Sequence, residues 1–152
     1  MSIMRLKMAE PTRDFVASVY IVKDGKVLLV HHRKLGMWLP PGGHIDGNEL
    51  PTECAVREAK EEAGVDIEIM GQEENYDRVR VMLHPKIVQL EDIEPGHQHI
   101  DLIYFAKLKD ESQKVKNEDV GVSEVRWFSR EELDEAPDLV KIQAIQAIEE
   151  LK

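Results

Sequence analysis

Three acidic residues are concentrated in one short stretch of the chain, and their spacing suits the binding of a cation. Glu58, Glu61 and Glu62 lie three and four positions apart, which on a helix brings the side chains together on one face. Like charges at this spacing destabilise a helix, and core packing does not require them. Three convergent carboxylates suit Mg²⁺ or Mn²⁺, which prefer oxygen ligands. Because an isolated acidic cluster is more often a solvated face, the surrounding sequence must decide.

The residues next to the cluster could hold these carboxylates in place. Arg57 precedes Glu61 by four positions and can pair with it on a helix. Glu49, ahead of the helix, could orient Arg57 or contact a water molecule bound to a metal ion. Gly42 and Gly43 leave the backbone unobstructed, so that a metal ion or a phosphate can approach a carbonyl or an amide.

The stretch 43–65 matches a known signature. Gly43, five residues, Glu49, seven residues and the run REAKEEAGV from Arg57 onward have the spacing of the Nudix box, the 23-residue signature of the Nudix (MutT-type) hydrolases. This resemblance implies an α/β/α sandwich of the α/β (α+β) class with a mixed β-sheet. It also implies hydrolysis, by water attack at phosphorus, of a nucleoside diphosphate linked to another moiety. Two flanking stretches resemble the family as well, namely 38–43 and 125–128.

Carried onto this chain, the resemblance assigns roles residue by residue. Glu61 is a direct or water-mediated ligand, whereas the Gly42 carbonyl is the backbone ligand. The cofactor is Mg²⁺ or Mn²⁺, which neutralises the diphosphate and lowers the pKa of a bound water molecule. The implied metal ligands are Gly42, Glu58, Glu61 and Glu62. The implied catalytic set is Glu49, Arg57, Glu61 and Glu118.

The general base in this set is not fixed by a motif. Family members take it from the box or from a later loop. Glu118 is our candidate, because it lies in the polar segment before the strand that contains Trp127. Asp119 and Glu124 are alternatives, and an ordinary loop carboxylate is as good an explanation of Glu118.

Two further groups of residues are candidates for contacts with substrate phosphates. Arg78 and Arg80 alternate with valines, so both are expected on one side of a strand, where they bind phosphate or are solvated. His97 and His99 could share one face of a strand. A zinc site there lacks a third ligand from any local motif, so one histidine contacting phosphate, or two ordinary strand-edge residues, is the better interpretation.

The substrate class is only partly defined by the sequence. The Pro or Tyr that often marks ADP-ribose and diadenosine-polyphosphate hydrolases is absent from the expected window, 81–83. Nucleoside triphosphates, including oxidised ones, and nucleotide sugars are left open as substrates. A Nudix-like module that senses a nucleotide without cleaving it is an alternative, although the complete box disfavours it. An isomerase of isopentenyl diphosphate type would need a catalytic cysteine, and Cys54 lies inside the box helix.

These residues require a small set of secondary-structure elements. A helix is predicted over 51–63, with Pro51 in its first turn and with Leu50 in place of a Ser or Thr cap, a loss of about 1 kcal/mol. Strands are predicted over 15–21, 27–30, 65–69, 79–83, 100–108 and 125–128, with a hairpin turn at 24–25 and a loop over 39–43. A capping box at 129–132 opens a short helix. The last helix is expected to bury Leu139, Ile142, Ile145 and Ile148.

Composition limits the class of protein. The 152 residues suit one domain, 1–152, with about ten loose residues at the start. A net charge of −10 disfavours extended nucleic acid, although bound cations would still recruit a nucleotide. No apolar run suits a membrane span, and the single Cys54 suggests the reducing cytoplasm. Family members are frequently dimers, which favours a homodimer.

Overall fold

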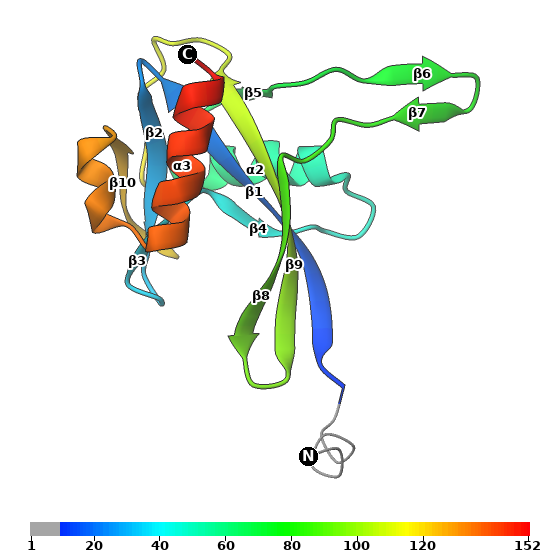
Figure 1. The fold of residues 1–152 in the computed structure, drawn as a ribbon, viewed down its shortest axis with the longest axis horizontal. Helices are drawn as coiled ribbons and strands as arrows, with labels where there is room; N and C mark the ends of the chain where they lie inside the picture. Colours follow the sequence, from blue (N-terminus) through cyan, green and yellow to red (C-terminus); the bar gives the residue numbers. More distant parts are fainter. Residues whose placement is uncertain (1–9) are drawn as a thin grey trace.

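The computed structural model describes residues 10–152, and it is built on one mixed, curled β-sheet (Figure 1). The eight-stranded sheet has the central order β10-β2-β1-β9-β5, with β3 on β2, β4 on β1 and β8 on β9. The expectation of a loose N-terminus falls mainly on residues outside the described range. The elements are β1 (Thr12–Lys23), β2 (Lys26–His32), β3 (Met37–Leu39), β4 (Gly42–His44), α2 (Pro51–Ala63), β5 (Ile67–Ile69), β6 (Glu74–Tyr76), β7 (Val79–Val81), β8 (Ile87–Glu94), β9 (His97–Leu108), β10 (Val122–Phe128), the 3₁₀ helix η1 (Glu131–Glu135) and α3 (Asp138–Glu150).

The centre of the sheet is formed by β1, which pairs with β2 and β4 in antiparallel orientation and with β9 in parallel orientation. The predicted hairpin between β1 and β2 is confirmed. Asp24 and Gly25 turn the chain with φ angles of 50° and 72°. Glycine adopts such a positive φ without strain, and aspartate is one of the few other residues that visit this region. The parallel pairing places residues 12–14 of β1 beside residues 97–99 of β9.

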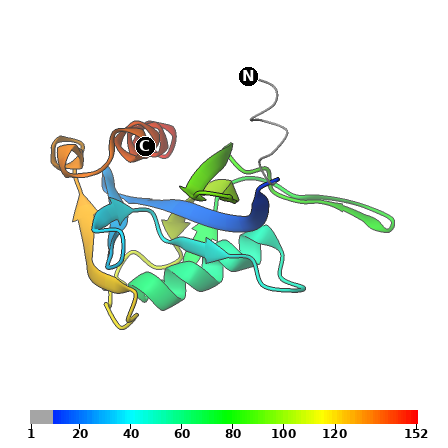
Figure 2. The ribbon, with the colours of Figure 1, turned by 90° about the horizontal axis from the view of Figure 1, so that it is seen from below.

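The two helices cover opposite faces of this sheet, as Figure 2 shows, so the predicted sandwich is confirmed. Alternate residues of β1 face the two sides. Val19 packs in the cluster that includes the buried alanines of α2, and Tyr20 packs in the cluster under α3. The Tyr20 hydroxyl also donates a hydrogen bond to Gln143 of α3 at 2.8 Å. The fully buried Ala55 and Ala59 allow α2 to approach the sheet closely.

The burial of α3 differs from the expectation. Leu139 and Ile142 are 53% and 62% exposed, whereas Ala144 and Ala147 are fully buried. The large aliphatic residues suggested one face of the helix, but small residues occupy the contact with the sheet because the helix lies close to it. Ile148 is buried as expected.

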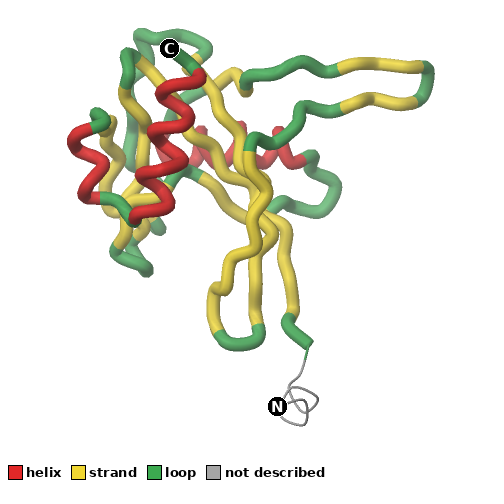
Figure 3. Tube along the Cα trace, viewed as in Figure 1, coloured by secondary structure: helices red, strands yellow, loops and turns green. Residues whose placement is uncertain are grey.

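Several short or polar strands were not predicted. The expected Pro-Gly loop contains β4, since Gly42 and Gly43 pair with β1. β8 escaped prediction because it presents Gln89 and Glu91 inward and exposes Val88, which is 61% exposed. β6 and β7 form a separate two-stranded ribbon that projects from the body (Figure 3). Within the described residues, no helix is long and apolar enough to cross a membrane.

Candidate active site

Helix α2 carries the acidic cluster and has well-defined ends. It begins at Pro51, as predicted, and the Glu53 carboxylate accepts a hydrogen bond from the Leu50 amide at 2.8 Å. This bond supplies half of a capping box, although the Leu50 side chain cannot accept one itself. At the other end Gly64 adopts a φ of 72°, and its amide donates to the Lys60 carbonyl. A left-handed glycine of this kind is a common helix terminator.

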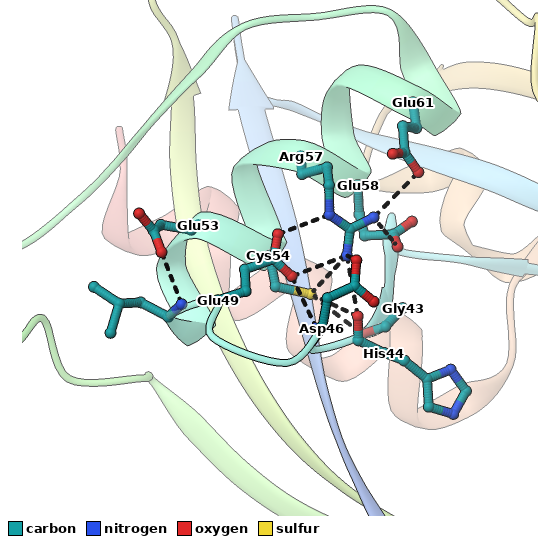
Figure 4. Close-up of polar contacts among 10 residues, drawn as sticks. Gly43, His44, Asp46, Glu49, Glu53, Cys54, Arg57, Glu58 and Glu61 are labelled. Carbon is teal, nitrogen blue, oxygen red and sulfur yellow. Dashed lines mark hydrogen bonds and ion pairs between the residues drawn. The ribbon is translucent and has the colours of Figure 1, made fainter.

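Arg57 is the centre of a polar network on this helix (Figure 4). Its Nε and Nη2 atoms donate to the two carboxylate oxygens of Glu49 at 2.7 and 3.0 Å. This paired geometry gives charge-assisted bonds of the strong class. The hydrogen bond from Arg57 holds the pKa of Glu49 below its usual range. The predicted pairing of Glu49 with Arg57 is therefore present in the structure.

The remaining donors of Arg57 reach the acidic cluster and the preceding strand. Nη1 donates to Glu58 at 2.9 Å and to Glu61 at 3.2 Å, and Nη2 donates to the His44 carbonyl at 3.1 Å. Asp46 lies 3.5 Å from Nη2. One guanidinium thus links the helix to β4 and to the loop that follows it. The carboxylates of Glu58 and Glu61 are fixed in relation to that loop as a result.

Glu62 lies in the most desolvated position of the acidic residues on this face. Its Oε1 atom accepts a hydrogen bond from the Gly42 amide at 2.8 Å. Burial is the main cause that raises the pKa of Glu62 to about 8. The bond from Gly42 opposes this rise, and the nearby charges of Glu58 and Asp119 contribute to it. Burial also raises the pKa of Glu58. Two carboxylates are therefore held where their ionised forms repel each other.

The glycines of β4 make room for these carboxylates. A Cβ atom on Gly43 would lie 2.4 Å from Oε1 of Glu58, so only glycine leaves the space that this side chain occupies. The donor set of Glu58, Glu61 and Glu62 consists of oxygen atoms only, and two members are partly desolvated. Such a set fits a hard divalent cation, which would replace their repulsion by attraction. Gly42 contacts Glu62 through its amide rather than its carbonyl.

The loop before β10 carries Asp119, whose negative charge acts on the carboxylates of α2. The charge of Asp119 raises the pKa of both Glu58 and Glu62. Glu118 is exposed, and within the described residues no hydrogen bond or ion pair joins it to another side chain. Glu124 is exposed on β10, paired with β2. Asp119, an alternative at the level of sequence, is thus the residue that the structure brings towards the cluster.

The proposed phosphate-binding residues lie outside the acidic cluster. The expectation that Arg78 and Arg80 share one side of a strand is wrong, because Arg78 lies in the turn between β6 and β7, where its side chain is 93% exposed. Arg80 of β7 forms an ion pair with Glu73. His97 and His99 lie at the start of β9 instead, next to Asp14 of β1. No local spacing pointed to Asp14, because the parallel pairing of two distant strands brings it there.

Cys54 does not have the environment of a nucleophile. The residue is fully buried, and its thiol lies 3.4 Å from the carbonyl oxygens of Gly43 and His44. Burial raises the pKa of the thiol to about 12. A protonated thiol donates hydrogen bonds and does not attack. An isomerase that relies on Cys54 as a catalytic residue is therefore disfavoured.

The chain is similar to known proteins over almost all of its length. A family model described as NUDIX domain matches residues 12–150. A probable DHNTP pyrophosphohydrolase from Lactococcus lactis subsp. cremoris is 28% identical over 131 residues, which cover 86% of this chain and 71% of that protein.

Solved structures show the same architecture. A hydrolase of the NUDIX family from Clostridium perfringens is 33% identical, with a TM-score of 0.81 over 93% of this chain and 99% of that chain. A MutT NUDIX hydrolase from Burkholderia pseudomallei is 21% identical, with a TM-score of 0.67 over 93% of this chain and 99% of that chain. At this lower identity the second structure is evidence for the fold alone.

Proposed function

Since this chain belongs to the Nudix hydrolase family, we propose that it is a metal-dependent pyrophosphohydrolase of nucleoside triphosphates or nucleotide sugars. The observation that carries the proposal is the pair of partly buried carboxylates, Glu58 and Glu62, held beside the glycines of β4. Such a pair is costly to ionise without a cation. A site that concentrates negative charge would repel a diphosphate unless a cation were bound there as well.

The residues proposed to hold the cation, Mg²⁺ or Mn²⁺, share one side of α2 and the start of β4. When bound, the ion supplies charge neutralisation for the diphosphate and lowers the pKa of water. Glu58 and Glu62 offer desolvated carboxylates, and Glu61 offers an exposed one that can act directly or through water. The Gly42 carbonyl is the proposed backbone ligand, while the amide of the same residue already orients Glu62.

Arg57 and Glu49 are proposed to position this set rather than to react. The guanidinium spans Glu49, Glu58 and Glu61, so its orientation determines where two of the carboxylates lie. Glu49 determines the orientation of the guanidinium through two bonds. Positioning of this kind contributes much of the rate in phosphoryl transfer, where the protein takes little part in covalent chemistry.

The proton acceptor for the attacking water is proposed to come from the loop before β10. Glu118 is the residue expected from its sequence position, and Asp119 is the one whose charge reaches Glu58 and Glu62. Glu118→Gln and Asp119→Asn separate the two. Loss of turnover with intact metal binding identifies the acceptor, and near-native turnover of either variant removes that residue from the mechanism.

The substrate class is tested by a panel assayed with Mg²⁺ and with Mn²⁺. The panel contains nucleoside triphosphates, oxidised nucleoside triphosphates, nucleotide sugars and DHNTP, which appears in the name of the Lactococcus relative. We expect release of pyrophosphate or of two phosphorylated products from at least one of these compounds. Binding without turnover across the whole panel would contradict the proposal and indicate a nucleotide-sensing module.

The proposal extends to the cellular location, the oligomeric state and the partners of the enzyme. We propose a cytoplasmic location, because the single Cys54 is buried as a protonated thiol and has no partner for an internal disulfide. A homodimer is proposed from the family resemblance. Extended nucleic acid is not an expected partner of a chain with a net charge of −10.

A further inference from the structure

We propose that Asp14, His97 and His99, with His44 beside them, form a second metal site that binds a late first-row divalent cation such as Zn²⁺. The parallel register of β1 and β9 places Asp14 opposite His99. Residues two apart on a strand face the same side, so His97 shares the face of His99. β4 pairs with β1 from the other side, where His44 lies opposite Val16. Three strands therefore bring four metal-binding side chains together.

The distances suit a small coordination sphere. One ligand atom each from Asp14, His97 and His99 lies within 4.8 Å of the other two. Oδ2 of Asp14 is 3.2 Å from Nε2 of His97 and 3.3 Å from Nε2 of His44. Ligands about 2.0–2.1 Å from a tetrahedral ion stand about 3.3 Å apart. The separations of Asp14 from His97 and from His44 already have this value, and His99 lies within 4.8 Å.

Thr12 holds the imidazole of His97 in an orientation that suits metal binding. Its hydroxyl lies 2.8 Å from Nδ1 of His97 and 3.2 Å from the Gly96 carbonyl. The other ring nitrogen, Nε2, points at Oδ2 of Asp14 across 3.2 Å. When a cation is bound at Nε2, the proton of the neutral ring lies on Nδ1 and the Thr12 oxygen accepts a hydrogen bond from it. Such a bond to the second ring nitrogen is typical of metal-binding histidines.

The ligand chemistry separates this site from the acidic cluster of α2. Two or three imidazoles with one carboxylate favour zinc and its neighbours, whereas a set of oxygen atoms favours Mg²⁺ or Mn²⁺. Asp14 at the centre also disfavours the phosphate contact expected of His97 and His99 from sequence. Glu91 lies opposite His99 in the pairing of β8 with β9 and adds negative charge near the site.

The two sites lie on opposite sides of β4 but share its backbone. A Cβ on Gly43 would point at Glu58 of α2, so the next side chain, that of His44, points to the other side. Figure 4 shows the His44 imidazole directed away from Arg57, while its carbonyl accepts a hydrogen bond from that residue. An ion held by His44 and Asp14 would therefore tie β4 to β1 and stabilise the backbone that carries the glycines.

Direct binding tests this site without an activity assay. Untagged protein, stripped of metal, is titrated with Zn²⁺ by calorimetry in excess Mg²⁺, and Co²⁺ absorption reports the coordination number. We expect one tight site with the strong visible bands of four-coordinate Co²⁺. Its affinity should fall by roughly 100-fold or more in a His97→Gln/His99→Gln variant, and by about 10- to 100-fold in Thr12→Val. The exposed His84→Gln is the matched control and should bind as wild type does.

A further variant separates this proposal from the proposed function. Glu62→Gln should lose hydrolysis and keep Zn²⁺ binding, because Glu62 belongs to the other site. Asp14→Asn, which preserves shape, provides a second test should the double variant fold poorly. Failure of the wild type to bind Zn²⁺ would overturn the inference. Unchanged binding in the His97 or Asp14 variants, or loss of binding in Glu62→Gln alone, would do so as well.

Discussion

The bond between Arg57 and Glu49 is expected to be among the strongest polar interactions on the molecular surface. Its two hydrogen bonds measure 2.7 and 3.0 Å, and the side chains are only 28% and 14% exposed. The perturbation is a double-mutant cycle of Arg57→Gln and Glu49→Gln. Each glutamine removes a charge while keeping a polar side chain.

The expected coupling energy is about 2 kcal/mol. Hydrogen bonds to charged groups contribute about 1.5–3 kcal/mol when one partner is removed, and partial exposure reduces this value. Arg57 also keeps its contacts with Glu58 and Glu61 when Glu49 is changed, which limits the loss. For a chain of this size, 2 kcal/mol corresponds to about 4–8 °C in melting temperature.

The assay is urea unfolding of the four proteins at pH 7 and again in acid. Since the pKa of Glu49 lies below its usual value of 4.5, the coupling is present above that pH. It disappears as the pH falls through the lowered pKa and the carboxylate gains a proton. The exposed pair Arg80–Glu73 on the ribbon is the control cycle, and it should show no measurable coupling. Additivity of the Arg57 and Glu49 changes within about 0.3 kcal/mol would refute the reasoning.

Three further results are expected. Gly43→Ala should fold normally but lose roughly 100-fold in turnover, because its Cβ displaces the Glu58 carboxylate; normal turnover would contradict the placement of that side chain. Ala144→Leu should lower the free energy of unfolding, measured in urea, by about 1–3 kcal/mol, because the larger side chain does not fit under α3. The exposed Ile142→Ala should change this free energy by less than about 0.5 kcal/mol. The reverse order of the two effects would contradict the burial of α3. Cys54 has a pKa of about 12, so it should react with a thiol reagent about 1,000-fold more slowly at pH 7 than a free thiol does. The rate should rise about tenfold for each unit of increase in pH. Rapid labelling of the folded protein at pH 7 would contradict the buried environment of this thiol.

The box helix could be predicted closely from the sequence because its signals are local. Pro51 defines its first turn and Gly64 its end, and the spacing of the three glutamates places them on one face. The hairpin at Asp24 is local in the same sense. Such features are determined by a few neighbouring residues and do not depend on how the rest of the chain packs.

Contacts between distant segments could not be predicted in this way. The burial of α3 depends on how closely it approaches the sheet, which the size of Ala144 and Ala147 determines and the pattern of large residues hides. β8 carries polar residues on its inner side and apolar residues on its outer side, which is the reverse of the usual pattern of a half-buried strand, so it was not recognised. Asp14 and His97 are 83 residues apart, and only the parallel pairing of β1 with β9 brings them together.

The most direct test of the account is the rate of hydrolysis of the best panel substrate as Mg²⁺ is titrated. The measurement compares wild type, Glu62→Gln and Glu53→Gln, the last of which changes a helix-capping carboxylate of α2 away from the site. We predict a saturating, Mg²⁺-dependent rate for wild type and Glu53→Gln, and only the metal-free rate for Glu62→Gln at every concentration. A wild-type rate independent of Mg²⁺, or an undiminished rate in Glu62→Gln, would contradict the assignment of the acidic cluster as the active site.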